Sequence, residues 1–182
     1  MSEVMLQQTQ VARVAEFYPR FLARYPTLED LAAAPADAVR ESWDGLGYYA
    51  RARNLHAAAR HVVRAAGGQL PRTPETLRRL PGIGRYTAGA VASLAFGAPV
   101  PAVDTNVARV LRRVFALRGR RKSAAHEARL WRLAGALVPP RRSADWNQAL
   151  MDLGATICTA RAPKCGACPV QTDCRSAGRP RR

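Results

Sequence analysis

The chain has 182 residues, 48% of them hydrophobic, which is enough to bury a core in one compact unit or in two small lobes. No run of 18 apolar residues occurs, so we expect no membrane-spanning segment and no membrane partner. The formal charge of +16 favours a polyanionic partner, most commonly nucleic acid, although only Lys122 and Lys164 are lysines among the 29 basic residues and codon usage can also produce such an arginine bias.

The residue pattern is helical almost throughout and contains no alternating strand pattern, which predicts an all-α fold. Two apolar stripes recur at helical spacing and are expected to face a core: Val11, Val14, Tyr18, Phe21 and Leu22, and further along Leu55, Ala58, Ala59, Val62 and Val63. Three hydroxyl residues are expected to cap helices: Thr27 a helix that runs to Leu31, Ser123 one that runs to Leu137, and Ser143 one that runs to Ile157.

A glycine-containing turn occupies the segment LPGIGRYTA at residues 80–88. Pro81 ends the preceding helix, while Gly82 and Gly84 permit a tight turn just before Arg85 and the next helix. Amides at a helix N-terminus carry partial positive charge, so this turn is suited to binding a phosphate without reading a base. An ordinary helix–helix turn is the alternative, because a lone G-x-G is a weak signal.

A proline-stiffened apolar segment, PVPAVDTN at residues 99–106, leads to a single carboxylate, Asp104, at the start of another helix. Helix capping explains most aspartates in this position. A rigidly held carboxylate near a phosphate-binding turn can also face the sugar of a bound nucleotide, and the two interpretations are compatible.

All four cysteines lie in one segment as Cys158, Cys165, Cys168 and Cys174, with the spacing C-x6-C-x2-C-x5-C. Four thiolates so close in sequence indicate one metal centre. Structural zinc usually takes two short ligand pairs, whereas here only Cys165 and Cys168 form such a pair, so the wide outer gaps favour an iron–sulfur cluster. Zinc and a disulfide-stapled tail are the alternatives, although four cysteines in 182 residues are sparse for a secreted scaffold.

The glycine turn, the proline-led aspartate and the cysteine string, in this order, resemble the helix-hairpin-helix DNA glycosylases that carry a [4Fe–4S] cluster loop. Three further segments resemble the MutY family of adenine glycosylases within that superfamily: SEVMLQQTQ at residues 2–10, GLGYYARARN at 45–54 and MDLGA at 151–155. The resemblance covers residues 2 to about 175 and implies a two-lobed, all-α helix-hairpin-helix glycosylase fold with a C-terminal [4Fe–4S] cluster loop.

The resemblance also implies a division of the chain. The expected parts are the start of the cluster-side lobe with the catalytic-acid helix at 1–20, a helical barrel lobe at 21–103 with the helix-hairpin-helix at about 75–96, helices returning to the cluster-side lobe at 104–157, the iron–sulfur loop at 158–174, and a basic tail at 175–182.

The activity that the resemblance implies is hydrolysis of the N-glycosidic bond of adenine mispaired with 8-oxoguanine or guanine in double-stranded DNA. Glu3 matches the general acid that protonates the flipped adenine at N7, and this role requires a pKa raised by burial. Asp104 matches the carboxylate that stabilises the cationic sugar. Tyr86 and Asn106 match positions that hydrogen-bond around this pair. From position alone, Glu3 is otherwise a solvated acid in a first helical turn.

Bifunctional relatives such as endonuclease III have a Schiff-base lysine at the Tyr86 position, and a tyrosine cannot form that imine. The resemblance therefore implies a monofunctional enzyme. Gln8 and Tyr48 match residues that wedge into the duplex beside the extruded base, although Tyr48 alone could be an ordinary core aromatic. Arg51 and Arg53 are expected to contact phosphates, together with the turn at Gly82, Gly84 and Arg85. These DNA contacts complete the expected site.

Family members have a longer segment before the serine–glutamate motif and a separate C-terminal domain that helps to recognise 8-oxoguanine. We therefore expect an N-terminally truncated chain without that domain, monomeric and cytoplasmic, associated with a bacterial nucleoid. Two alternatives stay open: a thymine or uracil mismatch glycosylase of the same superfamily, and a catalytically impaired DNA-binding remnant in which Glu3, so close to Met1, frays.

Overall fold

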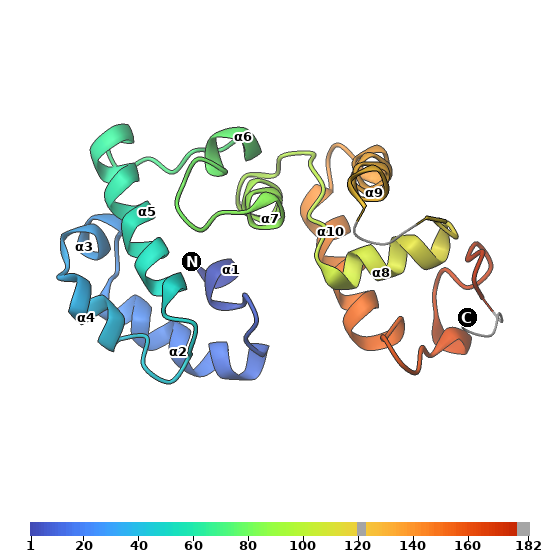
Figure 1. Cartoon of the computed structure of the whole chain (residues 1–182), viewed down its shortest axis with the longest axis horizontal. Coiled ribbons are helices and arrows are strands. Elements are labelled where there is room, and N and C mark those ends of the chain that lie inside the picture. Colours follow the sequence, from blue (N-terminus) through green and yellow to red (C-terminus); the bar gives the residue numbers. More distant parts are fainter. Residues whose placement is uncertain (120–122, 178–182) are drawn as a thin grey trace. The chain divides into compact units, whose positions relative to one another are not determined.

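The computed structural model describes residues 1–119 and 123–177, and within that range every regular element is a helix (Figure 1). The predicted all-α fold is confirmed. The chain divides into two compact units, Met1–Val91 and Ala92–Arg182, and the boundary falls inside helix α7. The basic tail expected at 175–182 lies partly outside the described residues.

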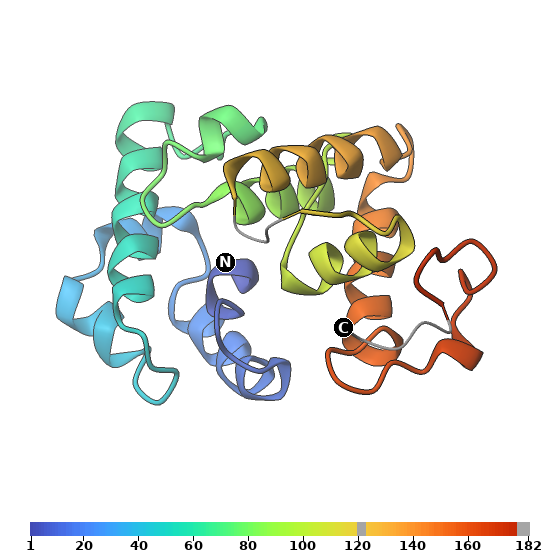
Figure 2. The same ribbon diagram turned by 45° about the vertical axis from the view of Figure 1, so that its right-hand side comes forward.

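The first unit contains six helices and the first half of a seventh among the described residues. These are α1 (Ser2–Met5), α2 (Val11–Arg24), α3 (Leu28–Ala33), α4 (Ala36–Glu41), α5 (Ala50–Ala66), α6 (Pro74–Leu77) and α7 (Arg85–Phe96). Helix α5 runs past α3 and α4 and contacts both, as Figure 2 also shows. Thr27 caps α3 in a reciprocal capping box with Asp30, as its sequence position predicts.

Aromatic and aliphatic side chains from α1 to α5 form one core in this unit. Trp43 and Phe21 lie at its centre and meet edge to face, with ring centroids 5.7 Å apart. Val4 and Met5 pack into the same core, and residues 1–20 fall within this first unit. The resemblance had instead implied that residues 1–20 begin the cluster-side lobe. Within the first predicted stripe Val11 is the exception, since it starts α2 and is 72% exposed.

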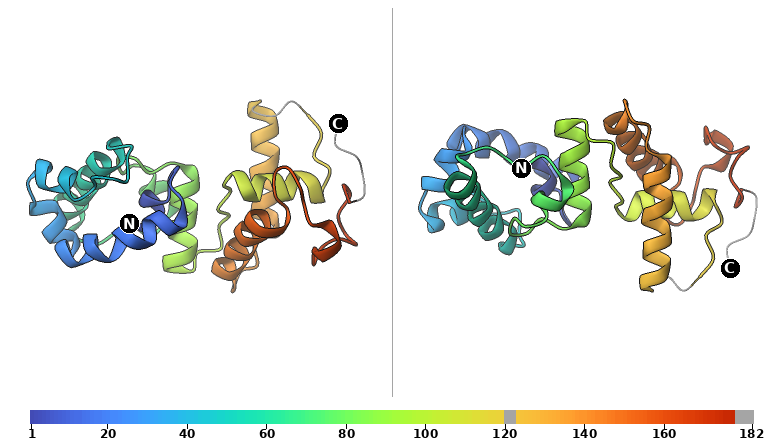
Figure 3. Two further views of the ribbon diagram at one scale, coloured as in Figure 1. Left: turned by 90° about the horizontal axis from the view of Figure 1, so that it is seen from below. Right: turned by 90° about the horizontal axis from the view of Figure 1, so that it is seen from above.

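The second unit is built from α8 (Thr105–Val114), α9 (Ala124–Leu137), α10 (Ser143–Asp152), the π-helix η1 (Leu153–Ile157) and the short 3-10 helix η2 (Cys165–Ala167). Helix α8 contacts both α9 and α10, and α9 crosses it in both views of Figure 3. Val107 and Leu111 of α8 bury against Leu130 and Ala134 of α9. Ser123 caps α9 by accepting a hydrogen bond from the His126 amide, as predicted.

The helical run predicted from a Ser143 cap to Ile157 does end at Ile157, but its cap and its last turn differ from the prediction. Ser143 lies inside α10, the N-cap is Arg142, and the buried Ser143 hydroxyl has no hydrogen-bond partner. The α-helix stops at Asp152 and continues as η1, in which the Cys158 amide bonds to the Leu153 carbonyl. A π-helix of this kind often marks a functional site. In the part of the chain that the structure describes, no helix is long and apolar enough to cross a membrane.

Candidate functional site

Glu3 projects from α1 and is paired with the start of α7. The Tyr86 hydroxyl donates to Glu3 Oε2 at 2.9 Å, and Gln7 Nε2 donates to Thr87 Oγ1 at 3.2 Å. Glu3 and Tyr86 are both partly buried. These two hydrogen bonds join residues about eighty positions apart in sequence and fix the segment that begins with α1 against α7. One of them holds the Glu3 carboxylate against the Tyr86 hydroxyl.

Arg51 is the most heavily hydrogen-bonded side chain of the first unit among the contacts described here. It is only 7% exposed, and burial lowers the pKa of this guanidinium from the ordinary arginine value. Its two terminal nitrogens lie 2.5–3.2 Å from five main-chain carbonyls, those of Val4, Met5, Gln7, Leu46 and Gly47, so one of the four N–H groups is shared between two acceptors. A guanidinium so engaged does not reach a phosphate in this conformation, which disfavours the DNA contact expected for Arg51.

The two residues expected to wedge into DNA are both held in an unusual backbone conformation. Gln8 has φ +56° and Tyr48 has φ +49°, in the left-handed region that non-glycine residues rarely adopt. Both side chains are exposed, Tyr48 by 60%, so Tyr48 is not an ordinary core aromatic. Arg53, two residues beyond Arg51 on α5, is also exposed.

The hairpin turn between α6 and α7 depends on one glycine more than on the other. Gly82 has φ +75°, and a Cβ there would lie 2.7 Å from Cβ of Asn54 on α5, so only glycine fits. Gly84 does not use the left-handed region, and a Cβ there would meet nothing within 4 Å. Gly84 is therefore not needed for the turn itself. It leaves open space in front of Arg85, which is exposed at the first position of α7.

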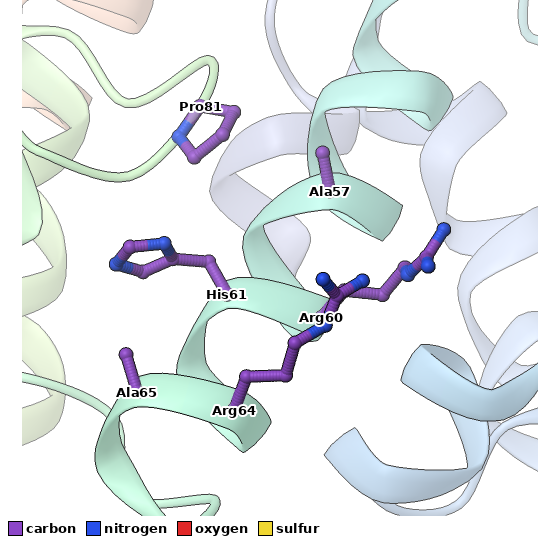
Figure 4. Close-up of a pocket in the computed structure, with 6 residues that line it drawn as sticks. All are labelled: Ala57, Arg60, His61, Arg64, Ala65 and Pro81. Carbon is purple, nitrogen blue, oxygen red and sulfur yellow. The ribbon is translucent and has the colours of Figure 1, made fainter.

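A groove that the sequence analysis did not identify lies between Pro81 of this turn and α5 (Figure 4). Arg60, His61 and Arg64 are among its lining residues; the His61 ring points toward Pro81 in Figure 4, whereas the Arg60 and Arg64 side chains extend away from Pro81. The spacing of these residues places them on one face of α5. The glycine turn thus lies beside His61 of α5 within the same unit.

Asp104 lies at the N-cap of α8, as predicted, and its Oδ1 accepts from the Val107 amide at 2.7 Å. Its other oxygen, Oδ2, accepts from Asn106 Nδ2 at 3.0 Å. Each carboxylate oxygen therefore has a fixed donor. Both donors orient the carboxylate relative to the helix.

Arg109 extends these contacts toward the cysteine segment. It donates to Asn106 Oδ1 at 2.7 Å, to the Gly154 carbonyl at 2.6 Å and to the Cys158 carbonyl at 2.8 Å. A Cβ on Gly154 would lie 2.7 Å from Asn106 Cβ, so the close approach of η1 to α8 requires glycine. Asp104 is thereby connected through two side chains to the residue that begins the cysteine string.

Asn147 supports the segment that leads to Asp104. It is 1% exposed; its Oδ1 accepts from the Ala102 amide, and its Nδ2 donates to Ser93 Oγ and to the Val100 carbonyl, all at 2.7–2.9 Å. The proline-stiffened approach is therefore fixed by one buried amide side chain from α10.

The four cysteines are free thiols, distributed from the end of η1 through η2 to Cys174. Arg113 contacts both ends of the string: Nη1 lies 3.3 Å from Cys158 Sγ, and the Cys174 thiol donates to the Arg113 carbonyl at 3.7 Å. Within residues 1–119 and 123–177, no three His, Cys, Asp or Glu side chains are grouped to hold a metal ion. Four free thiols, with the Arg113 guanidinium beside Cys158, fit the donor set of an anionic iron–sulfur cluster.

The structure thus brings Glu3 and Tyr86 together in the first unit, and Asp104 and Asn106 together in the second. Sequence reasoning missed the roles of Arg51, Arg109 and Asn147. Their partners are distant in sequence, and no local pattern reports them.

Comparison with known proteins identifies the chain's family. Residues 1–135 match the HhH-GPD superfamily base excision DNA repair proteins, and residues 158–174 match the iron–sulfur binding domain of endonuclease III. The iron–sulfur prediction is therefore confirmed, with Cys158, Cys165, Cys168 and Cys174 as the four cysteines of that domain.

Among similar proteins, the human adenine DNA glycosylase is 54% identical over 177 residues, which cover 97% of this chain and 32% of that protein. The adenine DNA glycosylase of Mycolicibacterium smegmatis is 45% identical over 182 residues, covering 99% of this chain and 61% of that protein. The chain thus spans about a third of the mammalian relatives that it matches.

Solved structures agree on the fold. A thermostable thymine-DNA glycosylase has a TM-score of 0.86 and 34% identity, covering 97% of this chain and 81% of that one. Endonuclease III in a non-covalent DNA complex has a TM-score of 0.82 and 29% identity over the same shares of the two chains. The chain folds as an all-helical, endonuclease III-like glycosylase with an iron–sulfur binding region near its C-terminus, and it belongs to the HhH-GPD superfamily of base excision DNA repair proteins.

Proposed function

We propose that this chain is the catalytic part of a monofunctional adenine DNA glycosylase, which hydrolyses the N-glycosidic bond of adenine opposite 8-oxoguanine or guanine. The observation that carries the proposal is the 2.9 Å hydrogen bond from Tyr86 to Glu3, because it joins a candidate acid to the residue that excludes lyase chemistry. The similarity to adenine DNA glycosylases over 97% of the chain supports the choice of base.

Glu3 is proposed as the general acid. Cleavage of the bond to adenine leaves an anionic purine unless a proton arrives at a ring nitrogen, and N7 is accessible in an extruded base. The Tyr86 hydroxyl donates to Oε2, which leaves Oε1 to carry and deliver the proton. Tyr86 is therefore a positioning residue for Glu3.

Asp104 is proposed to stabilise the positive charge that develops on the deoxyribose as the base departs. Its two oxygens are already oriented by the Val107 amide and by Asn106, so little reorganisation is needed when the charge appears. The same carboxylate can bond transiently to the anomeric carbon, as carboxylates do in retaining glycoside hydrolysis. Water then completes the hydrolysis and leaves an abasic site.

Tyr86 also limits the chemistry to hydrolysis. Strand cleavage by bifunctional relatives needs a primary amine that forms an imine with the opened sugar, and a phenol cannot form one. We therefore expect intact abasic strands, which break only on treatment with heat and alkali.

DNA is the proposed partner, and the first unit offers the elements for holding it. The hairpin turn with open space at Gly84 precedes the positive end of α7, and the groove with Arg60, His61 and Arg64 lies beside it. Because each neutralised phosphate releases counterions, affinity for duplex DNA should fall steeply as salt rises. An affinity independent of salt concentration would contradict this mode of binding.

The iron–sulfur cluster is proposed to be structural: bound by Cys158, Cys165, Cys168 and Cys174, it would cross-link the loop that carries them. Arg113 holds the ends of that loop, and Arg109 connects Cys158 to Asn106. Loss of the cluster should therefore disturb Asp104 through these contacts.

Thymine opposite guanine is a second candidate substrate. The likeness to a thymine-DNA glycosylase, with a TM-score of 0.86, favours it, and Tyr86 is compatible with either base. The resemblance of residues 2–10 to adenine glycosylases, and the 54% identity to the human adenine DNA glycosylase, favour adenine.

One experiment tests the proposal and separates the candidates. The protein, its Glu3→Gln and Asp104→Asn variants, and Glu16→Gln as a control at an exposed carboxylate on α2 are incubated with duplexes carrying A opposite 8-oxoguanine, A opposite G, and T opposite G. Adenine release that falls about 100-fold or more in both site variants, but not in the control, supports the proposal. Thymine release supports the second candidate, and binding without release indicates a DNA-binding remnant.

A further inference from the structure

We infer that Arg51 is the positioning residue for both DNA wedges, fixing Gln8 and Tyr48 in their left-handed conformations from one buried guanidinium. The inference rests on the proposed function, because Gln8 and Tyr48 act as wedges only if the protein inserts them into a DNA duplex. It replaces the phosphate contact that the sequence suggested for Arg51.

The first support is the position of the five accepting carbonyls. Three of them belong to α1 and the residues after it, ending at Gln7, and two belong to the turn before α5, ending at Gly47. Gln7 directly precedes Gln8, and Gly47 directly precedes Tyr48. Arg51 therefore fixes the peptide units that enter both wedge residues.

The second support is the conformational strain at Gln8 and Tyr48, which both have a positive φ. A non-glycine residue in the left-handed region is disfavoured and persists only where its surroundings determine it. Gln8 and Tyr48 are two of only three such residues in the described range, the third being Ala116 in the other unit. Both of the first unit's strained residues thus follow a carbonyl bound by the same side chain.

The third support is direct contact with the ring of one wedge. The Arg51 guanidinium carbon lies 5.5 Å from the centroid of Tyr48 and 5.5 Å from that of Trp43. Trp43 is fully buried, while Tyr48 is 60% exposed. Arg51 therefore orients the protruding ring against a rigid part of the core through cation–π attraction.

Lysine cannot replace this arrangement. Its single ammonium carries three donors at one point, whereas the planar fork reaches two separate sets of carbonyls at once. Arg51→Lys keeps the charge but releases at least one of the two segments, the one that ends at Gln7 or the one that ends at Gly47. Arg24→Lys is the matched control, because Arg24 is an exposed arginine at the end of α2 in the same unit and has no part in the proposed site.

The test uses hydrogen exchange on the free protein and the fluorescence of 2-aminopurine placed opposite 8-oxoguanine in a duplex. In Arg51→Lys we expect faster amide exchange in residues 6–10 and 45–49 together, without change in α3, and about 10- to 100-fold slower base extrusion. Arg24→Lys should match the wild-type protein in both. Unchanged exchange in either segment, or a uniform rise throughout the unit, would overturn the inference.

Two further outcomes are informative. If Arg51→Lys fails to fold, adding Gln8→Gly and Tyr48→Gly should restore folding but not extrusion, because glycine adopts these conformations without strain; failure to restore folding counts against the inference. If the wild-type protein extrudes no base from any duplex, the proposed function fails, and the exchange data still decide whether Arg51 fixes both loops.

Discussion

Replacement of Asn147 by alanine is predicted to destabilise the second unit strongly although Asn147 is not part of the reacting site. The side chain makes three hydrogen bonds, and two of its partners, the Ala102 amide and the Ser93 hydroxyl, belong to residues that are fully buried. A buried polar group left without a partner costs about 1–3 kcal/mol. Two such groups suggest a loss of about 2–6 kcal/mol in the free energy of unfolding, and the third partner, Val100, adds little because it is less enclosed.

Urea unfolding followed by circular dichroism, on protein with its iron–sulfur cluster intact, measures this loss. Gln148→Ala is the matched control: Gln148 is the next residue of α10, and its hydrogen bond to Asp152 is exposed, so its change should stay within about 0.5 kcal/mol. Adenine release by Asn147→Ala should also fall, because the segment leading to Asp104 loses its support. A free energy of unfolding within about 0.5 kcal/mol of the wild-type value would refute the reasoning.

Three further predictions follow from the same geometry. Asp104→Asn should abolish base release but change the free energy of unfolding by less than about 1 kcal/mol, because asparagine caps a helix as well as aspartate does; equal losses of activity and stability would contradict this. Gly82→Ala should lower the melting temperature and weaken DNA binding, since its Cβ meets Asn54 at 2.7 Å, whereas Gly84→Ala, with nothing within 4 Å, should leave the melting temperature unchanged. Cys165→Ser should remove the visible absorbance of iron and sulfide, and a wild-type protein that binds zinc without iron would contradict the cofactor assignment.

Local features of this fold could be predicted from the sequence because they depend on neighbouring residues. The caps at Thr27, Ser123 and Asp104 each bond to an amide three positions on, and the apolar stripe of α5 needs only helical spacing. The iron–sulfur cluster could be predicted for the same reason, since all four cysteine ligands lie within the short segment 158–174.

The remaining features depend on contacts between distant parts of the chain. Arg51 binds carbonyls 44–47 positions away, and Asn147 binds groups 45–54 positions away, so neither role appears in any local pattern. The helix predicted through Ile157 does reach that residue, but its last turn is a π-helix, where Gly154 approaches Asn106 on α8 and Arg109 binds the Gly154 carbonyl. Tertiary packing thus determined the π-helix against the local preference for a continuous α-helix.

The central claim is that Glu3 supplies a proton to N7 of adenine, and replacing that atom tests it most directly. A duplex with 7-deazaadenine opposite 8-oxoguanine offers a carbon where the proton would go. Single-turnover release is measured for the wild-type protein and Glu3→Gln on adenine and on the analogue. We predict that each change alone slows release by about 100- to 10,000-fold and that the two together add no further loss. Release of 7-deazaadenine by the wild-type protein at the adenine rate, or losses that multiply, would contradict the account.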